Sequence, residues 1–370
     1  MKKRILAILL ALVLVGSTAA VTSFFMNQKA AELEQTRSEA VANLICRVDY
    51  GDEPVYVIGH KTPDNDTVAS AIGMAHLLRS LGINAEPRIA GEVNLETEYS
   101  FSAIGYPTPE ILENAAGAQL CLVDHSAESQ AVDGAEDARI VGITDHHGIG
   151  DVSNSELICV FSCPAVSTCT IVYSLHEACG IELPKDIAAV LLTGLLSDSV
   201  NMKSSDVTPL DLIAFDELKA ISGISDTDSL YNGMLEAKLS YRGMSDTEIF
   251  YSDYKDYECN GYSYGIGSVK VARDELIPAM AERMQKVIEA ETAGGSEADL
   301  LLYQVYAEGY TLGYSGFSGK DADFAAQIID SAFGDIAKRD GGYYIFEPSL
   351  SRKKDIVPPI DEYLDSLPEK

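Results

Sequence analysis

Hydrophobic and polar residues follow one another in blocks that predict strands alternating with helices. Val55-Tyr56-Val57-Ile58 is a short apolar run typical of a buried strand, and residues 67–81 then show helical spacing up to Gly82. Similar strand-like and helical runs follow at residues 120–123, 140–143, 166–178 and 187–196. Strands that alternate with helices predict an α/β fold, in which a parallel sheet carries helices on both faces.

A polar stretch at residues 237–247 follows a long helical region and predicts a domain boundary. Beyond it, strand-like and helical runs occur at residues 263–271, 276–290, 300–306, 321–333 and 343–346. These runs predict a second, smaller α/β domain at the C-terminus. We therefore expect three parts, which are a leader with a stalk at residues 1–48, a first domain at 49–238 and a second at 248–370.

The leader differs in kind from the rest of the chain. Lys2, Lys3 and Arg4 precede an uncharged run at residues 5–26 that is rich in Leu, Val and Ala. Because about 20 apolar residues can cross a bilayer, this run predicts a retained signal-anchor or a cleaved signal peptide. The basic cluster would stay inside, so we expect a membrane-anchored, single-pass chain with extracytoplasmic domains, or a secreted one. The polar residues 27–43 predict a helical stalk.

The chain is strongly acidic, with 57 Asp and Glu against 27 Lys and Arg and a formal net charge of -30. Such a chain has no diffuse attraction for phosphate backbones, so we expect no nucleic-acid partner. A phosphorylated substrate would need a local electropositive site, which bound metal ions can provide. The seven cysteines match no zinc-binding spacing and are interpreted as buried thiols, with a Cys159–Cys163 disulfide left open.

Four clusters of Asp and His follow the predicted elements of the first domain. They contain His60, Asp64, Asp66, Asp124, His125, Asp145, His146, His147 and Asp198. One such residue alone is commonly a helix cap or a structural histidine. Together they gather at the carboxyl edge of a parallel sheet, where carboxylates repel one another unless a cation lies between them. Carboxylates mixed with imidazoles suit manganese, cobalt or zinc.

In this order the clusters resemble the DHH phosphoesterase superfamily and, more closely, the family II inorganic pyrophosphatases. The resemblance runs from about Val57 to Ile360 and includes residues 91–98, Met202-Lys203-Ser204 and the C-terminal Ser351-Arg352-Lys353-Lys354. That C-terminal segment differs from the Gly-Gly-Gly-His-type motif of the DHH nucleases. The resemblance implies a DHH metal-binding domain, a C-terminal phosphate-binding domain and an active site in the cleft between them.

The resemblance also implies a role for each site residue. The metal ligands would be His60, Asp64, Asp66, Asp124, His146 and Asp198. One ion would bind His60 and Asp64, and a second ion would bind Asp66 and His146. Asp124 and Asp198 would be shared between the two ions. Asp145 would orient the neighbouring histidines. Substrate binding and catalysis would use His147, Lys255, Arg352 and Lys353.

The function that the resemblance implies is hydrolysis of inorganic pyrophosphate to two phosphates by a water that two metal ions activate. The cofactors would be two Mn²⁺ or Co²⁺ ions, with a further Mg²⁺ arriving with the substrate. One alternative is a related DHH phosphoesterase that acts on short polyphosphate or nucleotide phosphoanhydrides. Another is a membrane-tethered sensor that binds phosphate or metal without turnover. The expected partners are pyrophosphate, or a similar small phosphoanhydride, and the membrane, while a homodimer is left open.

Overall fold

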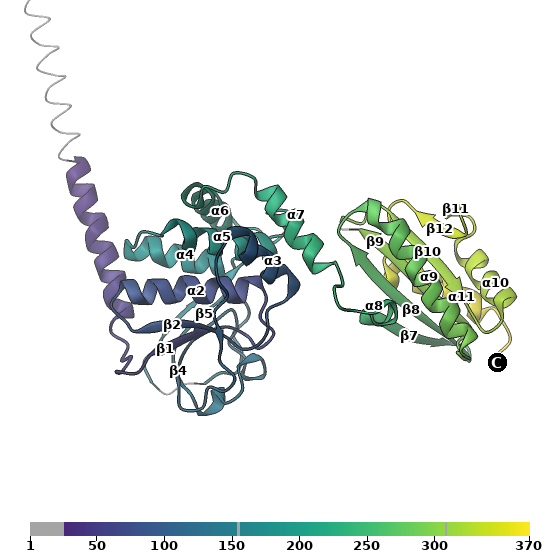
Figure 1. Cartoon of the computed structure of the whole chain (residues 1–370), viewed down its shortest axis with the longest axis horizontal. Helices are drawn as coiled ribbons and strands as arrows, with labels where there is room; N and C mark the ends of the chain where they lie inside the picture. The colour runs from purple at the N-terminus through teal and green to yellow at the C-terminus, as the bar shows by residue number, and fades with distance from the viewer. Residues whose placement is uncertain (1–25, 154–155, 308) are drawn as a thin grey trace, which may run out of the picture. The chain divides into compact units, whose positions relative to one another are not determined.

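The structure, a computed structural model, describes residues 26–153, 156–307 and 309–370. The chain divides into two compact units, the first ending at Met234 and the second comprising Leu235–Lys370 (Figure 1). The division adjoins the polar stretch at residues 237–247. The predicted fold class is confirmed, because the first unit contains a parallel sheet flanked by helices and the second contains a mixed α/β sheet.

The described chain begins with a helix over residues 26–45, drawn in purple in Figure 1, which covers the helix predicted for residues 27–43. This helix carries charged residues such as Lys29, Glu32 and Arg37, which a bilayer core disfavours. Across residues 26–153, 156–307 and 309–370, no helix has the length and apolarity needed to span a bilayer. The predicted membrane-anchored or secreted localisation is contradicted on this finding. Apart from Met26, the apolar run at residues 5–26 that suggested this localisation lies outside the described residues.

The first unit is built on a six-stranded sheet with the order β3-β2-β1-β4-β5-β6, in which every neighbouring pair is parallel. Its strands are β1 (Val55–Ile58), β2 (Ala85–Ile89), β3 (Glu110–Ile111), β4 (Gln119–Val123), β5 (Arg139–Asp145) and β6 (Cys159–Ser162). The chain first adds strands on one side of β1 and then on the other, so the order reverses between β1 and β4. Ligand sites in such sheets lie beyond the carboxyl ends of the strands at this reversal.

Most helices of the first unit pack together over one face of this sheet. They are α2 (Asn65–Ser80), α3 (Leu95–Ile104), α4 (Thr168–Cys179), α5 (Lys185–Asp198), α6 (Pro209–Ser222) and α7 (Thr227–Lys238), the last of which crosses into the second unit. Helix α2 lies on β1 and β2, and α4 and α5 pack against α2. Gly73 permits this approach, because a Cβ there would lie 2.6 Å from Leu191 and 2.9 Å from Val172. Leu120 and Leu122 belong to a separate core with Val132, beside the short 3-10 helices η1 (Glu128–Gln130) and η2 (Ala135–Asp137).

Polar side chains begin the helices that reach the site. Asp64 is the N-cap of α2, where its Oδ1 accepts a hydrogen bond of 3.0 Å from the Thr67 amide. Ser167 is the N-cap of α4 and accepts from the Cys169 amide. Thr208 and Asp211 form a capping box at the start of α6. These caps fix where each helix begins relative to the edge of the sheet.

The second unit has a mixed six-stranded sheet with the order β11-β12-β10-β9-β8-β7, in which β8 and β9 are parallel. Its elements are β7 (Tyr254–Cys259), β8 (Tyr262–Val271), β9 (Leu300–Ala307), β10 (Gly313–Ser318), β11 (Lys338–Asp340), β12 (Tyr343–Phe346), α8 (Asp246–Ser252), α9 (Ile277–Ala293), α10 (Ala322–Phe333), η3 (Asp274–Leu276), η4 (Arg352–Ile356) and α11 (Val357–Asp365). Alternate side chains of β8 and β9 enter two cores, one with α8 and α9 and the other with α10 and α11. Helices therefore cover both faces of this sheet.

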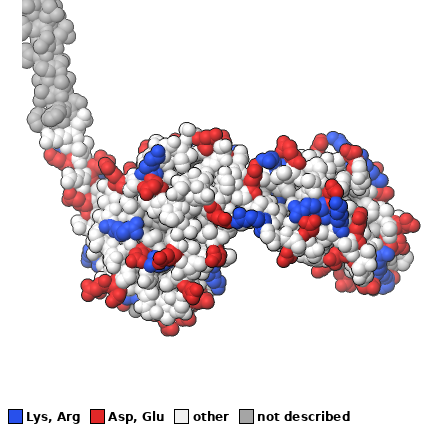
Figure 2. Space-filling model, viewed as in Figure 1, with Lys and Arg blue, Asp and Glu red and all other residues white. Residues whose placement is uncertain are grey.

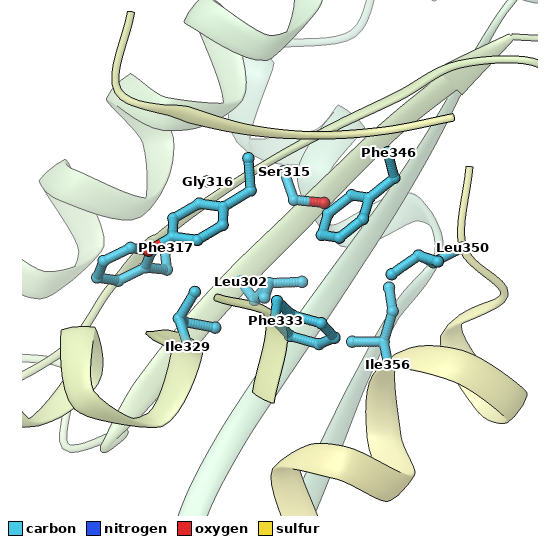
Figure 3. A pocket seen from close by; sticks show the side chains of 10 residues that line it. Leu302, Ser315, Gly316, Phe317, Ile329, Phe333, Phe346, Leu350 and Ile356 are labelled. Carbon is cyan, nitrogen blue, oxygen red and sulfur yellow. The ribbon is translucent and has the colours of Figure 1, made fainter. Parts of the chain in front are cut away.

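An apolar pocket lies within the core that α10 and α11 share with the sheet (Figure 3). Its lining includes Leu302, Phe333, Phe346 and Ile356. The lining contains no Asp, Glu, His, Lys or Arg side chain, so the pocket is a packing feature and offers no acid–base or metal chemistry.

The packing of α5 on α2 yields a stability prediction. Leu191 is fully buried between these helices, whereas Leu212 on α6 is 51% exposed. We expect Leu191→Ala to lower the free energy of unfolding by about 2–5 kcal/mol, because it leaves a cavity. The matched Leu212→Ala change should lower it by less than about 0.5 kcal/mol. Urea unfolding of the two variants measures both values, and equal losses would contradict this account of the core.

Candidate functional site

The six predicted metal ligands of the first unit lie together at the carboxyl edge of its sheet. His60 and Asp64 follow β1, and Asp124 directly follows β4 across the reversal of strand order. His146 directly follows β5. Two further acids come from helix ends, since Asp66 lies in the first turn of α2 and Asp198 is the last residue of α5.

Their donor atoms form overlapping groups in which all atoms lie within 4.8 Å of one another. The groups are His60-Asp64-Asp124, Asp66-His146-Asp198 and Asp124-His146-His147. The first group contains His60 and Asp64 and the second contains Asp66 and His146, the pairs that the resemblance assigns to separate ions, while Asp124 occurs only in the first and Asp198 only in the second of these groups. Asp124 and His146 each belong to two groups, so the groups adjoin one another. The ligand role of each residue stays a prediction.

Asp124 is the centre of this arrangement. Its Oδ2 lies 3.4 Å from His60 Nε2, and its Oδ1 lies 3.4 Å from His146 Nε2 and 3.6 Å from His147 Nδ1. The residue is only 1% exposed, and its backbone has a φ of 61°, a left-handed conformation that few non-glycine residues adopt. Left-handed residues in packed structures often occur at functional sites.

Asp66 is fully buried and is held by the start of α4. Its Oδ1 accepts hydrogen bonds from the Ser167 hydroxyl at 2.5 Å and the Cys169 amide at 3.1 Å. Its Oδ2 accepts from the Thr168 amide at 2.7 Å. Amides at a helix N-terminus favour a negative charge, so α4 stabilises the carboxylate form of Asp66.

The two histidines after β5 are oriented by other groups. His146 Nδ1 lies 3.0 Å from the Ala165 carbonyl oxygen, so Nδ1 carries the proton and donates it. His146 Nε2 faces the carboxylates of Asp124 and Asp198, and loss of its proton makes this nitrogen a lone-pair donor. His147 Nδ1 and its backbone amide both lie 3.0 Å from Asp145 Oδ1, and Ser126 donates to the other oxygen of Asp145. Asp145 thus contacts His147 as expected, while His146 is oriented by a backbone carbonyl.

Protons on the buried acids and on the imidazoles offset the negative charge of the cluster. Burial and the nearby Asp124 raise the pKa of Asp66 to about 7, and burial with Asp66 raises the pKa of Asp198 well above its usual range. Burial alone would raise the pKa of Asp124, but the imidazoles of His146 and His60, each 3.4 Å away, outweigh burial and lower it. Burial alone would lower the histidine pKa values, yet Asp124 raises that of His60 to about 10 and that of His146 to about 9.

These residues fit a divalent metal pair. His146 Nε2 is buried and has no hydrogen-bond partner among the described residues, although carboxylate oxygens of Asp124 and Asp198 lie 3.4 and 3.8 Å away, so an ion between them would satisfy all three groups. Two imidazoles and four carboxylates form the mixed nitrogen and oxygen donor set that suits manganese or cobalt. Cations at this place would offset the repulsion among Asp66, Asp124 and Asp198.

The other three predicted residues, Lys255, Arg352 and Lys353, belong to the second unit. Lys255 is exposed on β7, and Lys353 is exposed in η4. Arg352 Nη1 donates to the Asp253 carbonyl at 2.6 Å, and its Nη2 donates to Asp253 Oδ1 at 2.7 Å. These hydrogen bonds connect η4, near the C-terminus, to Asp253, the residue just before β7. On the face shown in Figure 2, Lys and Arg are interspersed among many Asp and Glu on both units.

Several residues of the site were not predicted from the sequence. Thr67, Ser167 and Thr168 donate hydrogen bonds to the predicted ligands, and Glu96 accepts a hydrogen bond of 2.8 Å from Ser197, next to Asp198. The only signal that could have found Thr67 is its place directly after Asp66. The start of α4 has no such signal, because it is joined to the site through tertiary structure alone.

Comparison with known proteins assigns both units to described domains. The family profile "DHH family, N-terminal domain" matches residues 54–195, and the "DHHA2 domain" profile matches residues 232–363. A probable manganese-dependent inorganic pyrophosphatase of Archaeoglobus fulgidus is 35% identical over 85% of this chain and 99% of its own. A manganese-dependent inorganic pyrophosphatase of Methanothrix thermoacetophila is 33% identical over 83% of this chain and 97% of its own.

A solved structure agrees with these relatives. The putative family II inorganic pyrophosphatase of Methanococcus jannaschii is 31% identical, with a TM-score of 0.53 over 84% of this chain and 100% of that one. The two profiles define a two-domain protein with a DHH domain followed by a DHHA2 domain. With relatives of this identity and coverage, the chain belongs to the family of manganese-dependent inorganic pyrophosphatases.

The protonation of the cluster predicts how metal binding depends on pH. His60, His146 and Asp66 have pKa values of about 10, 9 and 7, and each must lose its proton to bind a metal. A rise in pH removes these competing protons, so we expect the apparent affinity for Mn²⁺ to rise from pH 6 to pH 8.5. Each proton released should contribute about tenfold in affinity per pH unit. Calorimetric titration in buffers of different ionisation enthalpy counts the protons, and a pH-independent affinity without proton release would contradict this assignment.

Proposed function

We propose that this protein hydrolyses inorganic pyrophosphate to two phosphates, using two manganese ions held at the carboxyl edge of the first sheet. The observation that carries the proposal is the pair of donor groups His60-Asp64-Asp124 and Asp66-His146-Asp198, which adjoin where His146 Nε2 lies 3.4 Å from Asp124 Oδ1. The named activity of the family members described above supports the same reaction. Cobalt is the alternative metal, and a further Mg²⁺ would arrive with the substrate. Assembly as a homodimer stays a prediction.

The proposed ligands are His60 and Asp64 for one ion, Asp66 and His146 for the other, and Asp124 and Asp198 shared between them. A metal pair in such a site supplies Lewis acidity and lowers the pKa of a bound water. The chain supplies a buried, oriented set of donors, in which the cap of α2 and the start of α4 hold the carboxylates in place. Ligands fixed in this way need little reorganisation during the reaction.

We assign His147 to the substrate. Its side chain is 55% exposed, the largest value among the histidines of the cluster, and its Nδ1 is occupied by Asp145. Its Nε2 remains for a phosphate oxygen. A proton on this atom would be donated to the leaving phosphate, while the carboxylate of Asp145 stabilises the positive ring.

We assign Lys255, Arg352 and Lys353 to binding of phosphate oxygens. Arg352 contacts Asp253 and the Ile266 carbonyl through its Nη atoms, and these contacts fix the guanidinium plane. Lys255 lies two residues after Asp253 and pairs with Ile266 across β7 and β8, so the same contacts place Arg352 beside the start of the Lys255 strand. Guanidinium and ammonium groups are suited to phosphate oxygens, and they would neutralise the charge that develops during phosphoryl transfer.

The direct test of function is phosphate release from pyrophosphate by the metal-stripped chain reloaded with Mn²⁺ and Mg²⁺. We expect Asp124→Ala to lower the rate by more than about 100-fold, because loss of a group that only orients a ligand already costs about 10–100-fold. Glu136→Ala, an exposed carboxylate on η2, is the matched control and should keep the rate. Absence of release by the wild-type chain with manganese bound would overturn the proposed function. Phosphate release from short polyphosphate but not from pyrophosphate would identify the protein as a related DHH phosphoesterase.

The substrate-binding role of the second unit has its own test. We expect Lys255→Met to lower kcat/KM for pyrophosphate by on the order of 100-fold, because a charge contact to the reacting phosphate is lost. Binding of Mn²⁺ should be unchanged, since no predicted ligand is altered. Lys338→Met is the control, because Lys338 is exposed and pairs with Glu347 at 2.9 Å. Equal kinetics for the two variants would show that Lys255 is a surface charge.

A further inference from the structure

Each oxygen of the Asp124 carboxylate is held by a different threonine. Thr67 donates a hydrogen bond of 2.6 Å to Oδ2, and Thr168 donates one of 3.0 Å to Oδ1. The oxygens also face different histidines, because Oδ2 lies 3.4 Å from His60 and Oδ1 lies 3.4 Å from His146. Thr67 therefore lies on the His60 side of the carboxylate, and Thr168 lies on the His146 side.

The two threonines come from different helices and are shielded from water. Thr67 lies in the first turn of α2 and is 1% exposed, and Thr168 begins α4 and is 0% exposed. A hydroxyl shielded from bulk water gains stability by donating to a protein acceptor, and a carboxylate is a strong one. Thr168 also donates its amide to Asp66 at 2.7 Å, so one residue holds a carboxylate of each donor group.

The carboxylate of Asp124 is positioned by donors from two helices that begin far from it in the sequence. The residue follows the end of β4 in a left-handed conformation, and its amide is used by the Thr144 carbonyl. A carboxylate that rotates freely can turn both oxygens toward one cation. A hydroxyl donor on each oxygen fixes the carboxylate plane and leaves the remaining lone pairs directed at opposite groups.

We propose that Thr67 and Thr168 are positioning residues that assign one oxygen of Asp124 to each metal ion. Thr67 governs the His60 side, and Thr168 governs the His146 side. The inference rests on the proposed two-ion centre and extends it, because it says which residues would keep one oxygen of this carboxylate available to each ion. The two hydroxyls are called the threonine clamp below.

The test measures Mn²⁺ binding to the full chain without pyrophosphate, so it is independent of turnover. We expect Thr67→Val and Thr168→Val each to weaken one of two Mn²⁺ binding steps by about 10–100-fold, the usual cost of losing a group that orients a metal ligand. Thr67→Ser and Thr168→Ser keep the hydroxyl and should recover affinity to within about threefold of wild type. The wild-type protein should also show the electron paramagnetic resonance signal of a coupled manganese pair, which the valine variants lose.

Thr170→Val is the matched control. Thr170 lies one turn or less from Thr168 on α4, is equally buried, and its hydroxyl has no hydrogen-bond partner among the described residues. The same Thr-to-Val change there should leave both binding steps and the coupled signal intact. Thermal unfolding of the metal-free variants checks the fold. If a valine variant does not fold, Thr67→Ala and Thr168→Ala remove the same hydroxyls with less bulk.

Double-mutant cycles assign each threonine to its ion. The effect of Thr168→Val on affinity should vanish in a His146→Ala background and persist in a His60→Ala background, and Thr67→Val should show the reverse. Affinities of both valine variants equal to that of Thr170→Val would overturn the clamp, as would effects that are the same in both backgrounds. A chain that binds manganese as expected but releases no phosphate would overturn the proposed function and leave the clamp standing.

Discussion

Repulsion among buried carboxylates is the constraint on which the first unit depends. Asp66 and Asp124 are almost completely shielded from water, and Asp198 shares a donor group with Asp66. Burial and mutual repulsion raise the pKa of Asp66 and of Asp198, so the fold tolerates this cluster only through compensating groups. Two imidazoles, the start of α4 and the proposed metal ions provide that compensation. Such a cluster of perturbed carboxylates in a packed fold is typical of a functional site, and the donor groups could hold metal ions.

Most of the first unit can be understood as support for this edge. The parallel strands bring Asp124 and His146 side by side, and the reversal of strand order leaves room beyond β1 and β4. Helix α2 places Asp64 as its cap and Asp66 in its first turn, so one helix start contributes to both donor groups. Gly194 on α5 allows the final approach, because a Cβ there would lie 2.5 Å from the Cys169 sulfur and 3.1 Å from Asp66 Oδ1.

The fold and the ligands could be predicted from the sequence where their signals are local. The runs that form β1, β4 and β5 are apolar and are followed by Asp or His. Both the strands and the clusters can therefore be recognised in the sequence. Strand β2 was not expected, because Pro87 interrupts a strand pattern. The threonine clamp was not visible either, since its hydrogen bonds join residues 57 and 44 positions apart, and Ser167 lies 101 positions from Asp66. The membrane prediction depended on the basic cluster and the apolar run of the leader, which lie outside the described residues apart from Met26.

The most direct measurement is anomalous X-ray scattering from crystals of the manganese-loaded protein, recorded on both sides of the manganese absorption edge. The account predicts two anomalous peaks, one among His60, Asp64 and Asp124 and the other among Asp66, His146 and Asp198, with one oxygen of Asp124 directed at each. Manganese bound away from these residues, or a single ion held by both oxygens of Asp124, would contradict the two-ion centre from which the proposed chemistry follows.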